Sequence, residues 1–426
     1  MKKILIVSAR HLKENPYREI SLVDAFRKHN YIVTFIFPSR NLNKNGYKKE
    51  IVNDFYFKKF HIKFVSSYLE MASAIFHNDI ILFGSWKQYN KFAKLARTLG
   101  KTVLNFNSTS GLDHWGHGVD YSLIKGRFSK RYFIFLQVNQ KNNVKIPESK
   151  IIITGSIIHI YPTYLKKSIQ HNDFIKKYGV SKPIAVLFPK AIGGMEKKVP
   201  TWFKNWPPQK CYQYCEQLNI KYKEIIEQLT SNGFDVIVKL HPTAYTEYLT
   251  TYNKESKYWK QFSNIKILEA DDTYSCYLNM TVGIGITTHS ALDTGYYKKP
   301  FIYVDSDKFE IPKNNRVFQI QKLTSLPIGP SSHWNKENIC LNQWFPSWLG
   351  FYCTIDNLKL TLNDIKNNPN TISQEQHEMF MDEFWGGAYN DPVSTIVHET
   401  KKIKALKINR SVSQAKFFLK DLLSKW

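Results

Sequence analysis

The alternation of short β-branched runs with longer amphipathic stretches constrains the fold of this 426-residue chain most strongly. Most of the short runs are apolar on both faces, as are the strands of a parallel sheet covered by helices. Stretches such as Glu19–His29 and Trp86–Leu99 predict the intervening helices. Such alternation is typical of βαβ units. The strands predicted in the first half are Lys3–Ser8, Tyr31–Phe37, Asp79–Phe83, Lys101–Phe106, Tyr132–Val138 and Lys150–Thr154.

The pattern breaks once and then restarts, which predicts two α/β units. Residues 156–183 are polar and mostly helical in pattern, and an irregular insert, Lys190–Gln209, follows the first strand of the second unit as a lid or loop. We expect doubly wound, Rossmann-like domains at 1–156 and 183–400, a linker at 157–182 and a separate C-terminal helix at 401–426. The strands predicted in the second unit are Pro183–Pro189, Phe234–Leu240, Ile265–Leu268, Val282–Thr287 and Phe301–Asp305.

The charge balance narrows the classes of partner. The net charge of +25 attracts polyanions such as nucleic acid, anionic lipid, acidic polysaccharide or nucleotide phosphates. A nucleic-acid-binding protein is one hypothesis, but the chain has no helix-turn-helix, zinc-finger or RNA-binding signature. We therefore expect no nucleic acid partner.

The sequence favours a cytoplasmic location. No run reaches the ~18 apolar residues of a membrane span, and Met1–Val7 reads as a core strand because Arg10 and His11 follow it without a cleavage site. The five cysteines are scattered and odd in number, which suits a reducing compartment.

The last 26 residues have a composition of their own. Lys401–Trp426 contains eight Lys or Arg and one acidic residue, and apolar residues recur in it at helical spacing. Such a basic amphipathic helix could lie on an anionic membrane surface, which would make the protein peripheral at the inner face of the cytoplasmic membrane. A terminal helix packed on the protein itself is the alternative.

Two predicted strand ends in the second unit carry polar groups. Lys239-Leu240-His241-Pro242 places His241 at a helix start, where free N–H groups favour an anion. Thr288, His289, Ser290 and Asp293 follow Val282–Thr287 in the same way. Ligands bind beyond the carboxyl ends of such strands, so we expect both turns, taken to follow neighbouring strands, to contact one phosphate group. The alternatives are a loop histidine and a capping box at Ser290 and Asp293.

A third turn and a glycine pair have weaker links to ligand binding. The carboxylates of Glu269–Thr273 could hold a ribose or form a solvated turn, and Gly283-Ile284-Gly285 lacks the rest of a dinucleotide fingerprint.

The second unit resembles the C-terminal half of GT-B transferases for bacterial surface polymers. The resemblance rests on the Lys-x-His-Pro motif at 239–242, Asp272-x-Tyr274, the turn at 287–293 and the strand from Lys299, over roughly residues 183–305. It is similar to CDP-glycerol glycerophosphotransferases, polysialyltransferases and capsular Kdo transferases. The resemblance implies a GT-B-like fold with two domains facing a cleft, and a donor phosphate held by His241, Thr288 and Ser290.

We therefore predict a glycosyltransferase of capsule or lipopolysaccharide synthesis. Its second domain would bind a nucleotide-sugar donor, a CMP-linked acidic sugar by resemblance, with Lys239, Pro242, His289 and Asp293 adding contacts. Its first domain would bind a glycan or lipid-linked acceptor. The alternatives are a CDP-glycerol-type transferase and a hexosyl or heptosyl transferase using UDP- or ADP-sugars.

The catalytic base should come from polar loops outside the donor motifs. Asp113 and His114 lie in a glycine-flanked loop after a predicted strand, and Glu196 lies in the insert. Glu19 and His11, after the first strand, are further candidates. Positioned donors suffice to stabilise the leaving nucleotide, so we expect no essential metal and no further cofactor.

Overall fold

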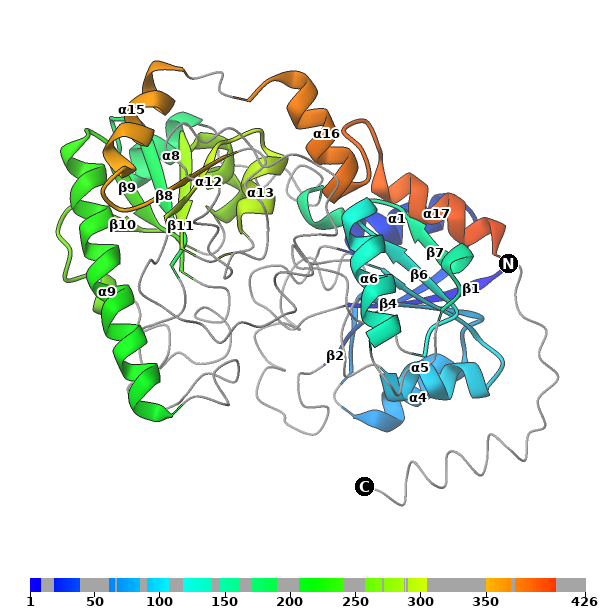
Figure 1. The fold of residues 1–426 in the computed structure, drawn as a ribbon. Coiled ribbons are helices and arrows are strands. Elements are labelled where there is room, and N and C mark those ends of the chain that lie inside the picture. Colours follow the sequence, from blue (N-terminus) through cyan, green and yellow to red (C-terminus); the bar gives the residue numbers. More distant parts are fainter. Residues whose placement is uncertain are drawn as a thin grey trace. The chain divides into compact units, whose positions relative to one another are not determined.

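The structure, a computed structural model, divides into two compact units (Figure 1). Unit 1 comprises Met1–Lys166 and Met381–Trp426, and unit 2 comprises Lys167–Phe380. The structure describes residues 1–8, 19–38, 61–65, 67–84, 90–106, 118–139, 146–160, 171–189, 207–240, 257–269, 272–286, 288, 290–304, 350–368 and 372–403, and each unit is described by itself.

Unit 1 is built on a 7-stranded parallel sheet in the order β3-β2-β1-β4-β5-β6-β7. The order reverses at β1, which pairs with β2 on one side and β4 on the other. Reversal at the first strand is the doubly wound arrangement. The strands are β1 (Lys3–Val7), β2 (Ile32–Pro38), β3 (Lys63–Val65), β4 (Ile80–Gly84), β5 (Thr102–Phe106), β6 (Tyr121–Ile124) and β7 (Ile151–Ile153).

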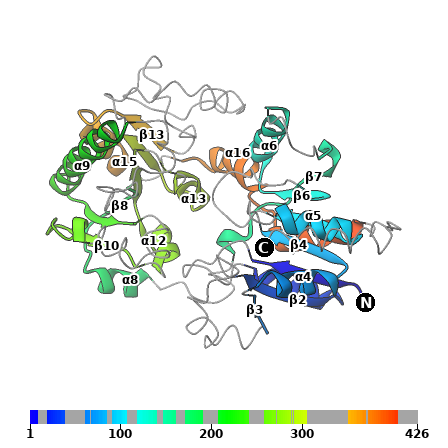
Figure 2. The same cartoon turned by 90° about the horizontal axis from the view of Figure 1, so that it is seen from below.

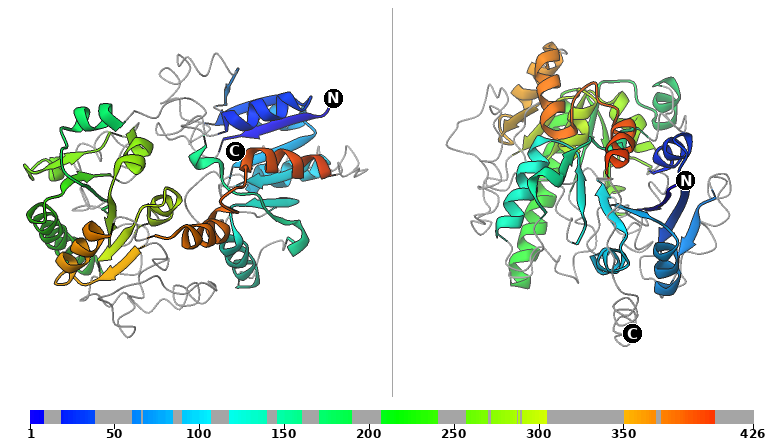
Figure 3. Two further views of the ribbon diagram at one scale, coloured as in Figure 1. Left: turned by 90° about the horizontal axis from the view of Figure 1, so that it is seen from above. Right: turned by 90° about the vertical axis from the view of Figure 1, so that its right-hand side faces the viewer.

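Helices cover both faces of this sheet. Figures 1 and 3 show α1 (Ile20–Lys28) beside α17 (Pro392–Lys402), while Figure 1 shows α4 (Tyr68–Phe76) and α5 (Asn90–Thr98) across the sheet from them. Leu5 and Val7 of β1 pack against the α4–α5 layer, and the alternating Ile4 and Ile6 are buried on the opposite face of the sheet. The remaining short elements are α6 (Arg127–Asn139), η2 (Glu148–Lys150) and η3 (Ile157–His159).

The chain returns to unit 1 within α16 (Gln374–Trp385). Close backbone packing fixes this return. A Cβ on Gly386, whose φ is +84°, would lie 2.8 Å from both Gly155 N and Lys125 O. Only glycine combines that conformation with that proximity. The Lys125 ammonium lies 4.6 Å from the ring centroid of buried Trp385, which adds a cation–π contact to the junction.

Unit 2 contains a 6-stranded parallel sheet with the same winding. The order is β10-β9-β8-β11-β12-β13, so the reversal lies at β8. The strands are β8 (Ile184–Leu187), β9 (Asp235–Val238), β10 (Ile265–Ile267), β11 (Val282–Gly285), β12 (Phe301–Val304) and β13 (Gly350–Cys353).

Figure 2 shows two helical layers around this sheet. One layer holds α9 (Pro208–Ser231) and α15 (Leu358–Asn367), and the other holds α8 (His171–Tyr178), α12 (Thr273–Asn279) and α13 (Ser290–Tyr296). Alternate residues of β8 pack against different helical layers. Ala185 and Leu187 pack with α9. Ile184 and Val186 pack with α8 and α12. This two-sided burial explains why the strands read as continuous apolar runs.

One predicted strand is wrong. Tyr132–Val138 lies within α6, which begins at Arg127. The helix buries Phe128 and Phe133, five residues apart and not at strand spacing. A short apolar run fits a strand or a buried helix equally well, so its length did not decide between them. Three strands were not predicted: β3, β6 and β13, each of only three or four residues.

The observed units also differ from the predicted boundaries. The second domain was predicted to extend to residue 400, whereas unit 2 ends at Phe380 and α17 packs against α1 of unit 1. Lys401 and Lys402 of the predicted terminal helix belong to the end of α17, and residues 404–426 lie outside the described part of the chain. Among the described helices, none is long and apolar enough to cross a membrane.

Candidate functional site

The candidate site of unit 2 lies at the carboxyl edge of its sheet. β8 separates β9 from β11, so the two polar turns do not follow neighbouring strands as predicted. They follow the two strands that flank the point of reversal, two strand spacings or roughly 10 Å apart. This is the position at which doubly wound sheets bind ligands. A ligand that contacts both turns must therefore extend across the end of β8.

A hydroxyl-rich turn connects β11 to α13. The Ser290 N–H donates to Thr288 Oγ1 at 3.1 Å, and the Tyr303 hydroxyl of β12 donates to the Thr288 carbonyl at 3.3 Å. Ser290 is the first residue of α13, so the side chain of Thr288 caps the helix start. Thr288 and Ser290 are both partly exposed. Two hydroxyl-bearing residues, both partly exposed, are thus held at the edge of the sheet.

Beneath this turn lies a buried pair formed by Tyr277 of α12 and Asp293 of α13. The Tyr277 hydroxyl donates to Asp293 Oδ2 at 3.4 Å. Burial raises the pKa of Tyr277 well above its ordinary value, the Asp293 carboxylate raises it further, and a hydrogen bond with the Ser290 hydroxyl lowers it. Tyr277 therefore stays protonated and links Ser290 to Asp293. Its ring stacks on Phe188, at the carboxyl end of β8, with centroids 5.9 Å apart.

The glycines of β11 have a packing role. A Cβ on Gly283 would lie 2.8 Å from the Phe301 ring, and one on Gly285 would lie 2.9 Å from Thr288 Cγ2. Both distances are shorter than van der Waals contact. Glycine at 285 thus allows the Thr288 turn to pack directly on the strand.

Lys239 follows β9 and is 6% exposed. Its charge acts on Cys276, whose pKa burial raises to about 12 while Lys239 lowers it and Asp272 raises it. The thiol is therefore protonated and unreactive at neutral pH. A buried cation thus lies on the β9 side of β8, while the hydroxyl turn lies on the β11 side.

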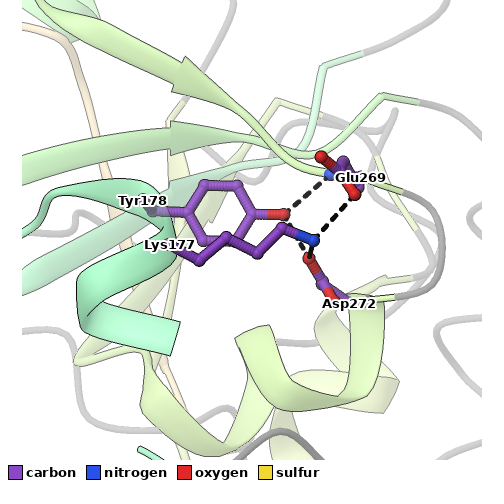
Figure 4. A network of polar contacts seen from close by, with 4 residues as sticks. All are labelled: Lys177, Tyr178, Glu269 and Asp272. Atoms are coloured by element: carbon purple, nitrogen blue, oxygen red, sulfur yellow. Dashed lines mark hydrogen bonds and ion pairs between the residues drawn. The ribbon is translucent and has the colours of Figure 1, made fainter. Parts of the chain in front are cut away.

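Asp272, at the start of α12, belongs to a separate network with Lys177 and Tyr178 of α8 (Figure 4). The Tyr178 hydroxyl donates to Asp272 Oδ2 at 2.5 Å and accepts from the Glu269 N–H at 3.0 Å. Lys177 Nζ lies 2.7 Å from oxygens of both Glu269 and Asp272. These four residues tie α8 to the turn between β10 and α12.

The pKa values in this network follow from its contacts. Burial and then the hydrogen bond to Asp272 raise the pKa of Tyr178 well above its ordinary value. Desolvation lowers the pKa of Lys177, but its hydrogen bonds to Asp272 and Glu269 outweigh this and raise it overall. The carboxylates of Glu269 and Asp272 therefore have structural partners within the fold, which is the alternative to the predicted ribose contact.

Several predicted site residues lie outside the described part of the chain. These are Asp113, His114 and Glu196 among the proposed bases, and His241, Pro242 and His289 among the donor contacts. The structure brings Thr288, Ser290 and Asp293 together around one junction and leaves Lys239 two strands away. Tyr277 and Tyr303 were not predicted; the signal for Tyr277 is its position three residues after Tyr274, on a helix that follows the flagged turn.

The expectation of a metal-free reaction has no support from motif content. The chain does contain an Asp-x-Asp tripeptide, Asp305-Ser306-Asp307, directly after β12, and it lies outside the described residues. Within the residues that are described, no three His, Cys, Asp or Glu side chains gather as metal ligands would.

Comparison with solved structures identifies the architecture. The UDP-GlcNAc 2-epimerase of Neisseria meningitidis, solved with UDP-GlcNAc, matches with a TM-score of 0.53 and 12% identity over 94% of this chain and 100% of that one. The same enzyme from Rickettsia bellii gives 0.54 and 12% over 97% and 99%. The wall teichoic acid polymerase TagF gives 0.51 and 12% over 94% and 89%. The chain has a GT-B-like fold.

At such identities the likeness establishes the GT-B-like fold and nothing finer. No protein-family model matches the chain, and no curated protein sequence is significantly similar to it. The GT-B-like fold nevertheless agrees with the two doubly wound α/β domains that the sequence predicted.

Proposed function

We propose that the protein is a glycosyltransferase of bacterial surface-polysaccharide synthesis. It would move a sugar from a nucleotide-activated donor, a CMP-linked acidic sugar, to a hydroxyl of a glycan or lipid-linked acceptor. The polymer would be a capsule or a lipopolysaccharide, as the sequence resemblance implies. Among the structures with this fold, TagF is a polymerase of a surface polymer, and the epimerases include one solved with UDP-GlcNAc.

The observation that supports this proposal most is the Thr288–Ser290 turn at the reversal point of unit 2. Thr288 and Ser290 are partly exposed. Tyr303 donates to the Thr288 carbonyl, and Tyr277, which donates to Asp293, hydrogen-bonds with the Ser290 hydroxyl. Hydroxyl and backbone donors fixed before the ligand arrives are suited to phosphate oxygens. His241 would add a further donor from beyond β9, and Lys239 a positive charge.

The reaction would need little covalent help from the protein. The acceptor oxygen forms a bond to the anomeric carbon of the donor and loses its proton to a base. The bond from that carbon to the nucleotide phosphate breaks, and its electron pair leaves with the phosphate. The positive field of Lys239 and the hydroxyl donors would stabilise the growing negative charge on that phosphate.

A second function is favoured by the enzymes that share the fold. Several are UDP-GlcNAc 2-epimerases, and the alignments cover nearly the whole of both chains. Incubation with UDP-GlcNAc alone separates the two functions. An epimerase would produce a second UDP-sugar, whereas a transferase would at most release free nucleotide. Conversion to an epimer would replace the transferase proposal.

The donor can be tested by the binding of free nucleotides. We expect CMP and CDP to raise the melting temperature of the protein, and UDP and ADP to do so less. Stabilisation by UDP without any by cytidine nucleotides would overturn the cytidine donor and favour a UDP-sugar transferase.

The phosphate site can be tested by mutation. Ser290→Ala removes a hydroxyl but keeps the N–H that Thr288 accepts, so nucleotide affinity should fall about tenfold, or ~1.4 kcal/mol. Ser73→Ala, exposed on α4 of unit 1, is the matched control and should bind as the wild type does. His241→Ala should abolish or severely reduce transfer in a folded protein. If Ser290→Ala keeps the wild-type nucleotide affinity and His241→Ala remains active, these residues do not form a phosphate site.

A further inference from the structure

The amino edge of the unit 1 sheet, where its strands begin, carries lysines next to exposed apolar side chains. Doubly wound sheets bind ligands at the other edge, the carboxyl one. Because the sheet is parallel, β1, β2, β4 and β5 begin at the amino edge, and α1, α4 and α5 end there. Lys401 Nζ lies 2.9 Å from His29 Nδ1, which places the end of α17 at this edge as well.

Two exposed apolar side chains, Ile32 and Phe76, lie on one side of this edge. Lys3 and Ile32 are register partners on β1 and β2. Both lie on the side of the sheet that α4 and α5 cover, since they are in phase with Leu5 and Ile36 of that core. Phe76 ends α4 on the same side. Ile32 is 44% exposed and Phe76 is 59% exposed, so unit 1 presents both to solvent beside a lysine.

Lys101, directly before β5, joins Phe76 to Lys3. Its Nζ donates to the Phe76 carbonyl at 2.9 Å and lies 5.7 Å from the centroid of the Phe76 ring. Desolvation lowers the pKa of Lys101, the nearby Asp79 carboxylate raises it, and the charge of Lys3 lowers it. Asp79 in turn accepts from the Lys3 N–H at 2.9 Å. The two lysines and the phenylalanine therefore form one cluster at the amino edge.

The charge of the amino edge is positive. Within the described segments 1–3, 28–32, 76–79, 100–102 and 399–403, the carboxylates are Asp79 and Glu399, and Glu399 pairs with Lys402 at 2.7 Å. The lysines of the same segments are Lys2, Lys3, Lys28, Lys101, Lys401 and Lys402. Lysines at helix ends suit the helix dipole. That structural role does not account for the exposed apolar side chains between them.

The course of the chain indicates what covers this edge. The described residues of unit 1 end at Ile403, directly after α17, and Lys401–Trp426 is the basic stretch whose apolar residues recur at helical spacing. The sequence that predicts contact with an anionic membrane thus begins at the amino edge. A second copy of the chain would oppose lysine to lysine, and a soluble polyanion would need no apolar side chains.

We propose that unit 1 docks on anionic phospholipid membranes through its amino edge. Ile32 and Phe76 enter the boundary between headgroups and acyl chains, and the lysines contact the lipid phosphates. Docking in this way turns the carboxyl edge of the same sheet away from the lipid. The interaction goes beyond the proposed transfer reaction and does not depend on the donor.

Removal of charge tests the lysines. The full chain is floated with vesicles of phosphatidylcholine alone or mixed with phosphatidylglycerol, without any donor. The wild type should bind the anionic vesicles more tightly. In Lys2→Gln/Lys3→Gln/Lys28→Gln this affinity should fall by about 100-fold, at roughly fivefold for each lysine. The matched control removes three exposed lysines of unit 2, Lys257→Gln/Lys260→Gln/Lys359→Gln, and should bind as the wild type does.

Removal of the apolar side chains separates a bilayer from other polyanions. Ile32→Thr/Phe76→Ser leaves every charge in place, and the affinity for anionic vesicles should fall by about tenfold. The matched control is Ile220→Thr/Leu360→Ser, whose side chains are similarly exposed on α9 and α15 of unit 2. It should keep the wild-type affinity. If the charge variant loses binding and the apolar variant does not, the edge binds polyanions and the proposal is wrong.

Hydrogen exchange in the wild type tests the surface without a variant and decides the matter if a variant does not fold. Anionic vesicles should slow exchange in peptides covering 27–33 and 76–80, and phosphatidylcholine vesicles should not. Protection confined to unit 2 or to residues after 403 would overturn the proposal, as would a wild type that does not bind anionic vesicles. Since no donor is present, these results leave the transferase proposal untouched.

Discussion

In the described part of unit 2, two buried aspartates each accept a hydrogen bond from a tyrosine, and the two pairs differ in their surroundings. Asp272 accepts from Tyr178 at 2.5 Å and pairs with Lys177 at 2.7 Å. Asp293 accepts from Tyr277 at 3.4 Å. Both aspartates are buried, so burial alone does not tell a binding site from a structural clamp.

The difference lies in what each tyrosine touches next. The Tyr178 hydroxyl accepts from the backbone of Glu269, so its network closes on the fold (Figure 4). The Tyr277 hydroxyl bonds to the side chain of Ser290, which is partly exposed at the sheet edge. The first pair holds α8 in place, whereas the second pair supports groups that a ligand can reach. The two pairs therefore differ in the exposure of the group that each tyrosine contacts, and a buried carboxylate by itself does not indicate a binding site.

The largest effect on stability should come from breaking the network of Asp272, Tyr178 and Lys177. Asp272→Ala leaves the Tyr178 hydroxyl buried without this acceptor and removes one of the two carboxylates that bind Lys177. We expect the free energy of unfolding to fall by about 1–3 kcal/mol. Chemical denaturation measures this change, and nucleotide affinity should stay at the wild-type value. A loss of nucleotide affinity in a folded Asp272→Ala protein would instead favour the ribose-binding reading of this turn.

A milder substitution at Asp293 should lower nucleotide affinity and leave stability nearly unchanged. Asp293→Asn keeps an acceptor for Tyr277 but removes the charge that, together with Tyr277, orients Ser290. We expect nucleotide affinity to fall about tenfold, equal to ~1.4 kcal/mol, with little change in stability. Titration calorimetry with the best-bound nucleotide gives the affinity, and Asp364→Asn on α15 is the control. Wild-type affinity in Asp293→Asn would make this second pair a clamp as well.

The sequence predicted the alternating sheet because every strand of a covered parallel sheet must be apolar on both faces. It predicted β1, β2, β4, β5, β7 and the first five strands of unit 2, most of which are buried on both faces. It failed at Tyr132–Val138, where an apolar run is helical, and it did not predict β3, β6 or β13.

The site was predictable only in part because its parts are joined through space. Thr288, Ser290 and Asp293 lie within six residues, so their junction could be inferred from the chain. Tyr277 and Tyr303 reach the same junction from α12 and β12 through contacts that no local pattern records. Strand order is equally nonlocal: nothing near His241 or Thr288 indicates that β8 lies between their strands.

The smallest expected effect concerns the pH dependence of stability, at the C-terminal end of α13. His377 of α16 contacts the carbonyls of Gly295 and Tyr296 at 3.1 and 3.2 Å through Nε2, which must carry the hydrogen because both partners accept. Desolvation lowers the pKa of His377 below its ordinary value of 6.5, although the two carbonyls raise it and Lys298 lowers it further.

The sign of the pH effect follows from that direction. The unfolded chain binds a proton more readily than the folded one, so the contribution of His377 is fully present above pH ~6.5 and is lost as the pH falls through its lowered pKa. His377→Gln can still donate to the carbonyls but does not titrate. Its free energy of unfolding should therefore decline less than that of the wild type between pH about 8 and about 5. His398→Gln, exposed on α17, should follow the wild-type decline, and an equal decline in His377→Gln would show that this contact does not sense pH.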